Sequence, residues 1–306
     1  MRKIIYLIGA FLICFSCQED VEIGDPLEII EDYQLPQSGA SDEANNRILK
    51  IYEDYGSYVL YDYTQTDALW QQAAGVAANQ VYVVKMGDAT YVEDMLDYVQ
   101  DVWFQFFPNE FLKKGGLPYR VFLADSVYQI RTNGRYIMYN QMINGNAIVI
   151  AGMNKDLKTM TAATKRSRSL ELINTLWNYY IAEGLLDVPE KFYDGTDYST
   201  MPEIPLSDST NLEAYRKRGF LPSGYSGSGK PSEWFYSSKW GTSWTSAKTN
   251  DLNSYMYNIM QRTDEQMAEY LNNPDYELIR TKWNILVNYY KDEYNIDLRK
   301  IAHVTY

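Results

Sequence analysis

The chain has little histidine and little cysteine, and both shortages restrict its chemistry. Among 306 residues there is one histidine and there are two cysteines. A metal site with several histidine ligands is therefore excluded. A His-based catalytic triad is not expected either, because His303 lies near the carboxyl end. We interpret His303 as a solvated residue.

Both cysteines belong to an amino-terminal segment that reads MRKIIYLIGAFLICFSCQED. Arg2 and Lys3 precede an apolar run over 4–13, which is shorter than the ~20 residues that span a bilayer. The pattern is therefore typical of an export signal. Ser16 directly before Cys17 resembles a bacterial lipobox, and no A-x-A-like site follows that would favour an ordinary signal peptide with incidental cysteines. We predict a lipoprotein signal peptide over 1–16 and a mature chain that begins at lipidated Cys17.

Lipidation at Cys17 would anchor the protein without spanning the membrane. Several acyl chains on one residue exceed the two signals that stable anchoring requires. The residues that follow, Gln18, Glu19 and Asp20, resemble the acidic signal that sends lipoproteins of Bacteroidetes to the outer face of the outer membrane. We expect a cell-surface lipoprotein whose folded part has no disulfide, no cysteine zinc ligand and no cysteine nucleophile.

Positive charge is also scarce. The chain has 28 basic and 40 acidic residues and a formal net charge of −12. Such a surface repels phosphate backbones, so nucleic acid is not an expected partner. A hydrophobic content of 46% with 22% charged residues indicates a globular protein. Its 29 tyrosines and 7 tryptophans suit cores, wet interfaces and sugar-binding surfaces alike.

Composition and periodicity divide the chain into a tether and a folded part. Residues 17–42 contain proline, glycine and acidic residues and predict a flexible tether. The remaining 43–306 predicts a domain of the α+β class, in one or two lobes, with a small mixed sheet and a largely helical C-terminal half. Strands are expected at 81–84, 119–123 and 147–151. Helices are expected at 92–104, 157–183, 211–218, 231–239, 247–261, 263–272 and 275–294.

Two familiar chemical motifs are weak here. The segment GYSGSGK at 224–230 fits most of a phosphate-binding loop, but Pro231 stands where the magnesium-binding Ser or Thr belongs. We predict a flexible loop instead. Paired carboxylates could hydrolyse a glycosidic bond, but no spacing singles out a pair among 40 acids. A hydrolase with unidentified carboxylates is therefore the third alternative for function.

The helix predicted over 157–183 carries the most specific signal. Within ELINTLWNYYIAE, Asn174 and Asn178 stand one turn apart, which is the spacing of the two metal-binding histidines of zinc peptidases. By spacing alone, such a pair is typical of a solvated polar face. Leu172, Ile173 and Leu176 supply the opposite apolar stripe.

The chain resembles the zinc-binding metallopeptidase-like surface lipoproteins of Bacteroidetes, which are associated with SusC/SusD-type uptake systems. The likeness covers much of 43–300 and rests on NRILKIYEDYGSYVLYDY, LPYRVFLAD, the helix above, YRKRGFLPSGYSGSGKPSEWF and YYKDEYNIDLRKI. It implies a zincin-like fold. In the family's H-E-F-x-H motif, the two metal-binding histidines align with Asn174 and Asn178, and the general-base Glu aligns with Thr175. The family's G-F…Y pattern is retained at Gly219, Phe220 and Tyr225. A later acidic motif is retained in part, at Glu233 and Phe235, and Ser237 stands at the position of its last Glu.

The resemblance therefore implies a degenerate metallopeptidase, or pseudoenzyme, without a metal or other cofactor. An amide binds zinc far more weakly than imidazole, and Thr175 cannot activate a metal-bound water. Asn174, Asn178, Trp177 and Glu233 could instead form a ligand cleft for a peptide or sugar. The alternative is a former active site that has become packed core.

The function implied is that of a non-catalytic accessory subunit of outer-membrane nutrient uptake. Its partners would be a SusC/SusD-like transporter pair and the imported oligopeptide or glycan. The alternative from another class is a self-sufficient glycan-binding protein. We predict a docking surface at Trp234, Tyr236, Trp240 and Trp244, unless the helix at 275–294 with Trp283 covers these side chains.

Overall fold

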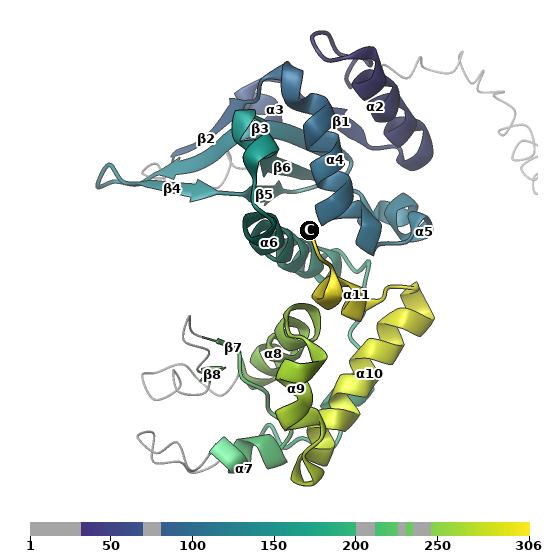
Figure 1. Cartoon of the computed structure of the whole chain (residues 1–306), viewed down its shortest axis with the longest axis vertical. Coiled ribbons are helices and arrows are strands. Elements are labelled where there is room, and N and C mark those ends of the chain that lie inside the picture. The colour runs from purple at the N-terminus through teal and green to yellow at the C-terminus, as the bar shows by residue number, and fades with distance from the viewer. Residues whose placement is uncertain (1–31, 70–80, 200–211, 226–230, 235–245) are drawn as a thin grey trace, which may run out of the picture. The chain divides into compact units, whose positions relative to one another are not determined.

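The structure, a computed structural model, describes residues 32–69, 81–199, 212–225, 231–234 and 246–306 (Figure 1). The chain divides into two compact units, Met1–Gln34 and Leu35–Tyr306, and the second contains every element described below. The predicted signal peptide and Cys17 lie outside the described residues, as does most of the predicted tether.

A mixed sheet is organised around one long strand, β3. The first half of β3 pairs in parallel with β1 and β6, and its second half pairs antiparallel with β2 and β4. Strand β5 pairs antiparallel with β6. The six strands are β1 (Tyr58–Leu60), β2 (Val81–Met86), β3 (Arg120–Ile130), β4 (Tyr136–Tyr139), β5 (Gln141–Asn144) and β6 (Ala147–Ala151).

The strands follow from runs of β-branched and aromatic residues. Strand β6, predicted over 147–151, is buried at all five positions, as expected for a strand covered on both faces. The strand predicted over 119–123 is β3, and it continues beyond the predicted end to Ile130. Burial alternates in the last residues of this extension, 127–130. That extension allows β3 to pair with β2 and β4 as well.

Helices pack on the sheet and supply its core (Figure 1). They are α2 (Asp42–Tyr55), α3 (Gln65–Leu69), α4 (Val92–Val102), α5 (Asn109–Phe111) and α6 (Ala162–Ala182). The prediction of one helix over 157–183 is wrong at its start. A separate 3-10 turn covers Lys155–Thr159, and Thr161, in extended conformation, caps α6 by accepting a hydrogen bond from the Thr164 N–H.

The C-terminal half is helical, as predicted. It contains α7 (Leu212–Lys217), α8 (Ala247–Gln261), α9 (Asp264–Leu271), α10 (Glu277–Tyr294) and α11 (Leu298–His303). The prediction of a helix over 231–239 is wrong at its start, because Pro231–Ser232 forms β8 and pairs with β7, Gly224–Tyr225. Residues 235–239 and the loop residues 226–230 lie outside the described part. The predicted α+β class with a small mixed sheet is confirmed.

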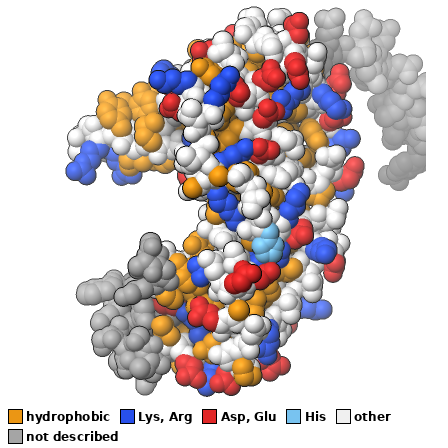
Figure 2. Space-filling model, in the orientation of Figure 1, with side chains coloured by type: hydrophobic (Ala, Val, Ile, Leu, Met, Phe, Trp, Pro, Cys, Tyr) orange, Lys and Arg blue, Asp and Glu red, His pale blue; other side chains and the backbone are white. Residues whose placement is uncertain are grey.

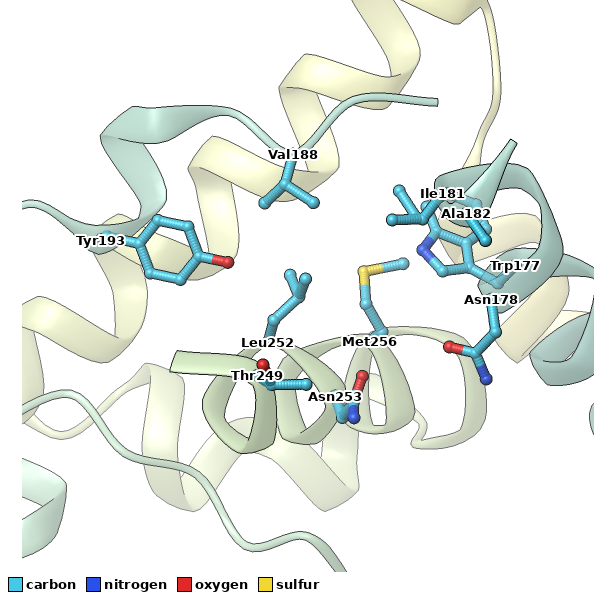
Figure 3. A pocket seen from close by; sticks show the side chains of 10 residues that line it. All are labelled: Trp177, Asn178, Ile181, Ala182, Val188, Tyr193, Thr249, Leu252, Asn253 and Met256. Carbon is cyan, nitrogen blue, oxygen red and sulfur yellow. The ribbon is translucent and has the colours of Figure 1, made fainter. Parts of the chain in front are cut away.

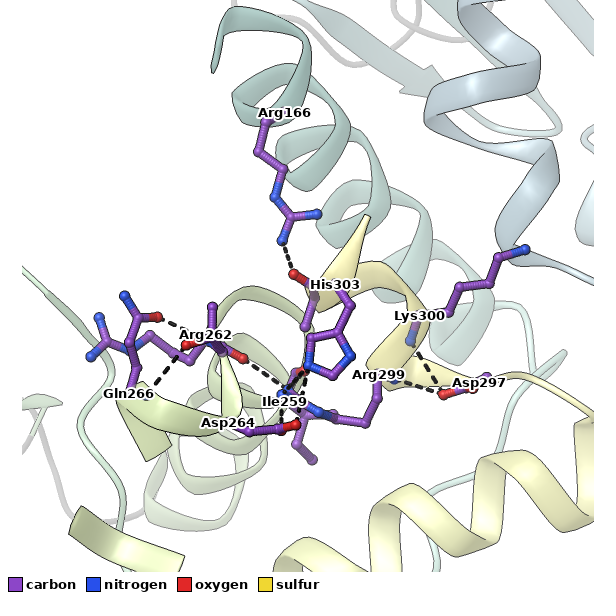
Figure 4. Close-up of polar contacts among 11 residues, drawn as sticks. Arg166, Ile259, Arg262, Asp264, Gln266, Asp297, Arg299, Lys300 and His303 are labelled. Carbon is purple, nitrogen blue, oxygen red and sulfur yellow. Dashed lines mark hydrogen bonds and ion pairs between the residues drawn. The ribbon is translucent and has the colours of Figure 1, made fainter. Parts of the chain in front are cut away.

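Polar contacts hold α11 against the neighbouring helices (Figure 4). The Arg299 guanidinium donates to the carbonyl oxygens of Ile259 and Arg262 and pairs with Asp264 at 2.6 Å. His303 Nε2 lies 3.4 Å from an Asp264 oxygen, and Arg166 donates to the carbonyls of Ile301 and Ala302. His303 is thus half-exposed within a surface ion-pair cluster. No helix in the described ranges is long and apolar enough to cross a membrane.

Candidate functional site

Helix α6 places the two asparagines on its outer side. Asn174 and Asn178 are exposed, whereas Leu176, Trp177 and Tyr180 are buried. Thr175, at the position of the family's general base, donates to the Glu171 carbonyl and accepts from the Gln141 amide at 3.0 Å. Its hydroxyl is therefore used in attaching α6 to the sheet.

The surroundings of these positions show no cluster of metal ligands. Across the described ranges, no group of three or more His, Cys, Asp or Glu side chains is placed to hold an ion. The residues at the motif positions are amides and a hydroxyl, which are poor zinc ligands. The described residues thus lack the donors that a zincin uses.

A pocket of about 360 Å³ opens beside the C-terminal half of α6 (Figure 3). Its walls come from three segments: α6, α8, and the stretch around the 3-10 turn Glu190–Tyr193. The lining residues are Trp177, Asn178, Ile181, Ala182, Val188, Tyr193, Thr249, Leu252, Asn253 and Met256. This volume lies in the range of small-molecule sites.

Trp177 forms part of the inner wall. Its ring packs edge-on against Tyr290, with the centroids 4.6 Å apart and an interplanar angle of 83°, so the indole is held in place. The indole Nε1–H is buried and has no hydrogen-bond partner in the described structure. Figure 3 shows this nitrogen on the cavity side of the ring. A buried donor without a partner is unfavourable, and this nitrogen has almost no accessible surface, so the cavity reaches the ring rather than its N–H.

Neutral polar groups surround the mouth of the pocket. Thr249 and Asn253 lie one turn apart on α8, and both are exposed, as is Asn178 on α6. The Tyr193 hydroxyl points toward the cavity in Figure 3. Burial, followed by the nearby Asp251 carboxylate, raises the pKa of Tyr193, so this hydroxyl is un-ionised at neutral pH. Among the residues that the structure describes, the lining carries no charge.

This arrangement suits binding better than bond cleavage. The amides and hydroxyls offer donors and acceptors, while Ile181, Val188, Leu252 and Met256 offer apolar contact. A hydrolytic site needs an acid or base in reach of the substrate, and the described part of the lining contains no carboxyl group or histidine. A neutral ligand with hydroxyl or amide groups matches these walls.

Of the four predicted cleft residues, the structure brings two together. Trp177 and Asn178 line the pocket, whereas Asn174 and Glu233 do not. Glu233 pairs with Arg216, and both side chains are almost fully buried. Burial raises the pKa of Glu233, and the Arg216 guanidinium opposes that shift. Arg216 also donates to the Phe220 carbonyl at 2.8 Å, so this pair has a structural role.

The predicted docking residues fall largely outside the described residues. Trp234 is half-buried and packs edge-on against Phe220, with centroids 5.6 Å apart. Tyr236, Trp240 and Trp244 are not described. The docking surface stays a prediction.

The sequence signal for the opposite wall of the pocket is weak. Thr249 and Asn253 come from the helix predicted over 247–261, to which the sequence assigns no functional role, and Tyr193 lies outside every predicted element. The one hint is the one-turn spacing of Thr249 and Asn253, which repeats that of Asn174 and Asn178.

Comparison with known proteins adds little to this geometry. No family model matches the chain, and no curated protein matches it either. Among solved structures, it is similar to a Bacteroides caccae crystal structure titled a "putative zinc-binding metallo-peptidase", with a TM-score of 0.42 and 9% identity over 86% of this chain and 91% of that one. A likeness at this TM-score establishes neither a shared fold nor a shared activity.

Proposed function

We propose that this protein is a non-catalytic binding protein whose Trp177 pocket takes a neutral polar ligand, a short glycan or an oligopeptide segment. The observation that carries the proposal is the lining, in which the described residues are uncharged and combine apolar side chains with the exposed polar groups of Asn178, Thr249 and Asn253. A charged ligand group would find no counter-ion among these lining residues.

The shape of the pocket constrains how the ligand would bind. Trp177 is only 4% exposed, so it offers a narrow apolar edge rather than a broad stacking face. Asn178, Thr249 and Asn253 would contact the ligand at the rim, where their amides and hydroxyl can reorient. Specificity in such a site comes from a few placed polar groups within apolar walls.

The non-catalytic part of the proposal rests on residue types. At the positions that resemble the family's metal and base residues, this chain has Asn174, Thr175 and Asn178. Thr175 is already hydrogen-bonded to Glu171 and Gln141, and a threonine cannot act as the base that such a mechanism needs.

We further propose that the protein is anchored through Cys17 at the outer membrane and serves a SusC/SusD-like transporter pair as an accessory subunit. The amino-terminal pattern and the family resemblance support this setting. A self-sufficient glycan-binding protein is the second candidate, and the same uncharged pocket favours it. The two differ in whether the purified protein binds ligand without the transporter.

The test is a binding titration with matched variants. Neutral oligosaccharides and uncharged oligopeptides would be titrated calorimetrically into the wild type, Asn178→Ala and Asn253→Ala. Loss of one ligand hydrogen bond, ~1 kcal/mol, predicts about fivefold weaker binding for each variant.

Asn174→Ala is the control, because Asn174 is exposed one turn away on the same helix but does not line the pocket. It should bind like the wild type. Equal affinities in all four proteins, or binding of charged ligands only, would refute the pocket as the site.

A further inference from the structure

The exposed apolar side chains of this protein are concentrated on one part of the sheet. Four large hydrophobic residues are exposed in the described part of the chain, and three of them lie on β2 and β4: Met86 at 48%, Tyr136 at 65% and Met138 at 63%. We call β2, the second half of β3 (126–130) and β4 the ribbon. In Figure 1 the β3–β4 hairpin extends away from the helices.

Strand register places several of these side chains on one face. Tyr136 lies opposite Ile130, and Met138 lies opposite Tyr128. Tyr128 in turn lies opposite Val83. Residues directly opposite in antiparallel strands project to the same side, and the Tyr128 and Tyr136 rings are 5.5 Å apart. Val83, Tyr128, Ile130, Tyr136 and Met138 therefore form one apolar face, which we call the ribbon face.

The turn that joins β3 to β4 is basic, whereas the protein as a whole is acidic. The chain contains 40 acidic residues, yet none occurs from 126 to 154. Arg131 and Arg135 lie at the hairpin turn, where the Arg131 N–H donates to the Arg135 carbonyl at 2.9 Å, and both side chains are exposed. Figure 2 shows hydrophobic and basic side chains gathered on this arm. Arg131 and Arg135 follow Ile130 and Tyr136 as the next opposite pair, so they project to the other side of the hairpin. The apolar face and the basic turn beside it together match an anionic partner.

We propose that the ribbon face, together with the two arginines of the hairpin turn, is a membrane-contact surface for an anionic bilayer. Tyr136 and Met138 enter the interfacial layer, and Arg131 and Arg135 bind lipid phosphates. Tyrosine suits that layer because its ring is apolar and its hydroxyl is polar, and arginine binds phosphate through two parallel hydrogen bonds.

Size favours a lipid surface over a protein partner. A stable protein interface uses about 20–30 residues on each side, whereas the ribbon face and the hairpin turn together offer five apolar residues and two arginines. Few inserted side chains and few basic residues give weak, reversible attachment, as a single membrane signal does. Beside a lipid anchor, such a contact would fix the orientation of the domain rather than its attachment.

The test uses the mature chain from residue 18 onward, which keeps the whole compact unit Leu35–Tyr306 and has no acyl chain. It is sedimented with vesicles of phosphatidylcholine alone and of phosphatidylcholine mixed with phosphatidylglycerol. We expect binding to the mixed vesicles that falls as salt is raised. Each of Arg131→Gln and Arg135→Gln should lower the partition coefficient about fivefold, and Tyr136→Ser with Met138→Ser should lower it further.

Two control variants separate this contact from general stickiness. Lys113→Gln with Lys114→Gln removes an adjacent pair of exposed charges elsewhere, and Tyr119→Ser removes the exposed aromatic residue that lies off the ribbon. Both should bind like the unmodified chain. The proposal is overturned if the chain ignores mixed vesicles or if the controls lose as much binding. It is also overturned if the chain is a dimer that Tyr136→Ser with Met138→Ser dissociates, because the face would then join two copies.

Discussion

Removal of the buried Lys282 ammonium should strongly destabilise the helical half of the protein. Lys282 on α10 pairs with Asp251 on α8, and both side chains are fully buried. The ammonium also donates to the Gly219 carbonyl at 3.1 Å and to the Tyr198 hydroxyl at 3.3 Å. Aromatic rings surround it, with the Phe192 centroid at 4.6 Å and the Tyr255 centroid at 4.8 Å.

Lys282→Met keeps most of the side-chain volume and leaves Asp251 buried without a counter-charge. One Asp251 oxygen already lacks a partner among the described residues. Breaking a buried pair by removal of one member lowers the free energy of unfolding by ~3–5 kcal/mol. In Lys282→Met/Asp251→Leu both charges are absent, so the loss should fall to about 1–2 kcal/mol, from the Gly219 and Tyr198 hydrogen bonds alone.

The pH dependence of the single variant has a definite sign. Burial raises the pKa of Asp251, and Lys282 opposes that rise, so Lys282→Met should raise this pKa further. A group whose pKa is higher in the folded than in the unfolded state favours folding at low pH, and that contribution is lost as pH rises through the folded pKa. The stability deficit of Lys282→Met should therefore be larger at pH 8 than at pH 5.

Urea unfolding at both pH values measures these differences. Lys50→Met is the matched control, because Lys50 pairs with Asp54 on the exposed side of α2 and such pairs contribute less than ~1 kcal/mol. The reasoning is refuted if Lys282→Met loses no more stability than Lys50→Met. It is also refuted if the double variant is less stable than Lys282→Met.

Three other predictions concern the core, the metal and the anchor. Tyr180→Phe should lower the free energy of unfolding by about 1–3 kcal/mol. The Tyr180 hydroxyl donates to the buried Gly116 carbonyl at 2.7 Å and accepts from Trp103 Nε1 at 3.1 Å, and the variant loses both hydrogen bonds. As a control, Tyr179→Phe at the half-buried neighbouring position should change the free energy of unfolding little. Elemental analysis of purified protein should find no stoichiometric zinc, and one tightly held zinc per chain would contradict the degenerate site. Cys17→Ala should release the protein from the outer-membrane fraction, and protease treatment of intact cells should degrade the wild type; an untouched wild type would argue against surface exposure.

Local patterns predicted much of the secondary structure. The apolar run at 147–151 is strand β6, and the periodic segment 247–261 is helix α8, each with the predicted bounds. In both segments the pattern of apolar residues shows which side chains are buried, and burial favours the element. Errors occurred where a backbone contact competes with periodicity. Thr161 caps α6 and separates it from the turn before it, and Pro231–Ser232 pairs with β7 instead of starting a helix.

The candidate site is only half visible in the sequence. The 3.6-residue period places Asn178 on the outer side of α6, and the scarcity of histidine and cysteine by itself argues against a zinc peptidase. The period cannot show what α6 packs against. Tyr193, Thr249 and Asn253 join Asn178 through contacts between segments distant in the chain, and such contacts leave no local pattern.

The sequence by itself determined the class of the fold, the shortage of metal-binding side chains and the amphipathic faces of the helices, because each depends on residue type and spacing alone. Tertiary structure decided which polar residues are buried in pairs and which line a pocket. Glu233 and Asp251 resemble any other acid in the sequence, but packing sets Arg216 and Lys282 beside them in the interior. Packing sets no charged residue in the described lining beside Trp177, and that difference in surroundings separates the two buried ion pairs from the pocket that we propose as a binding site.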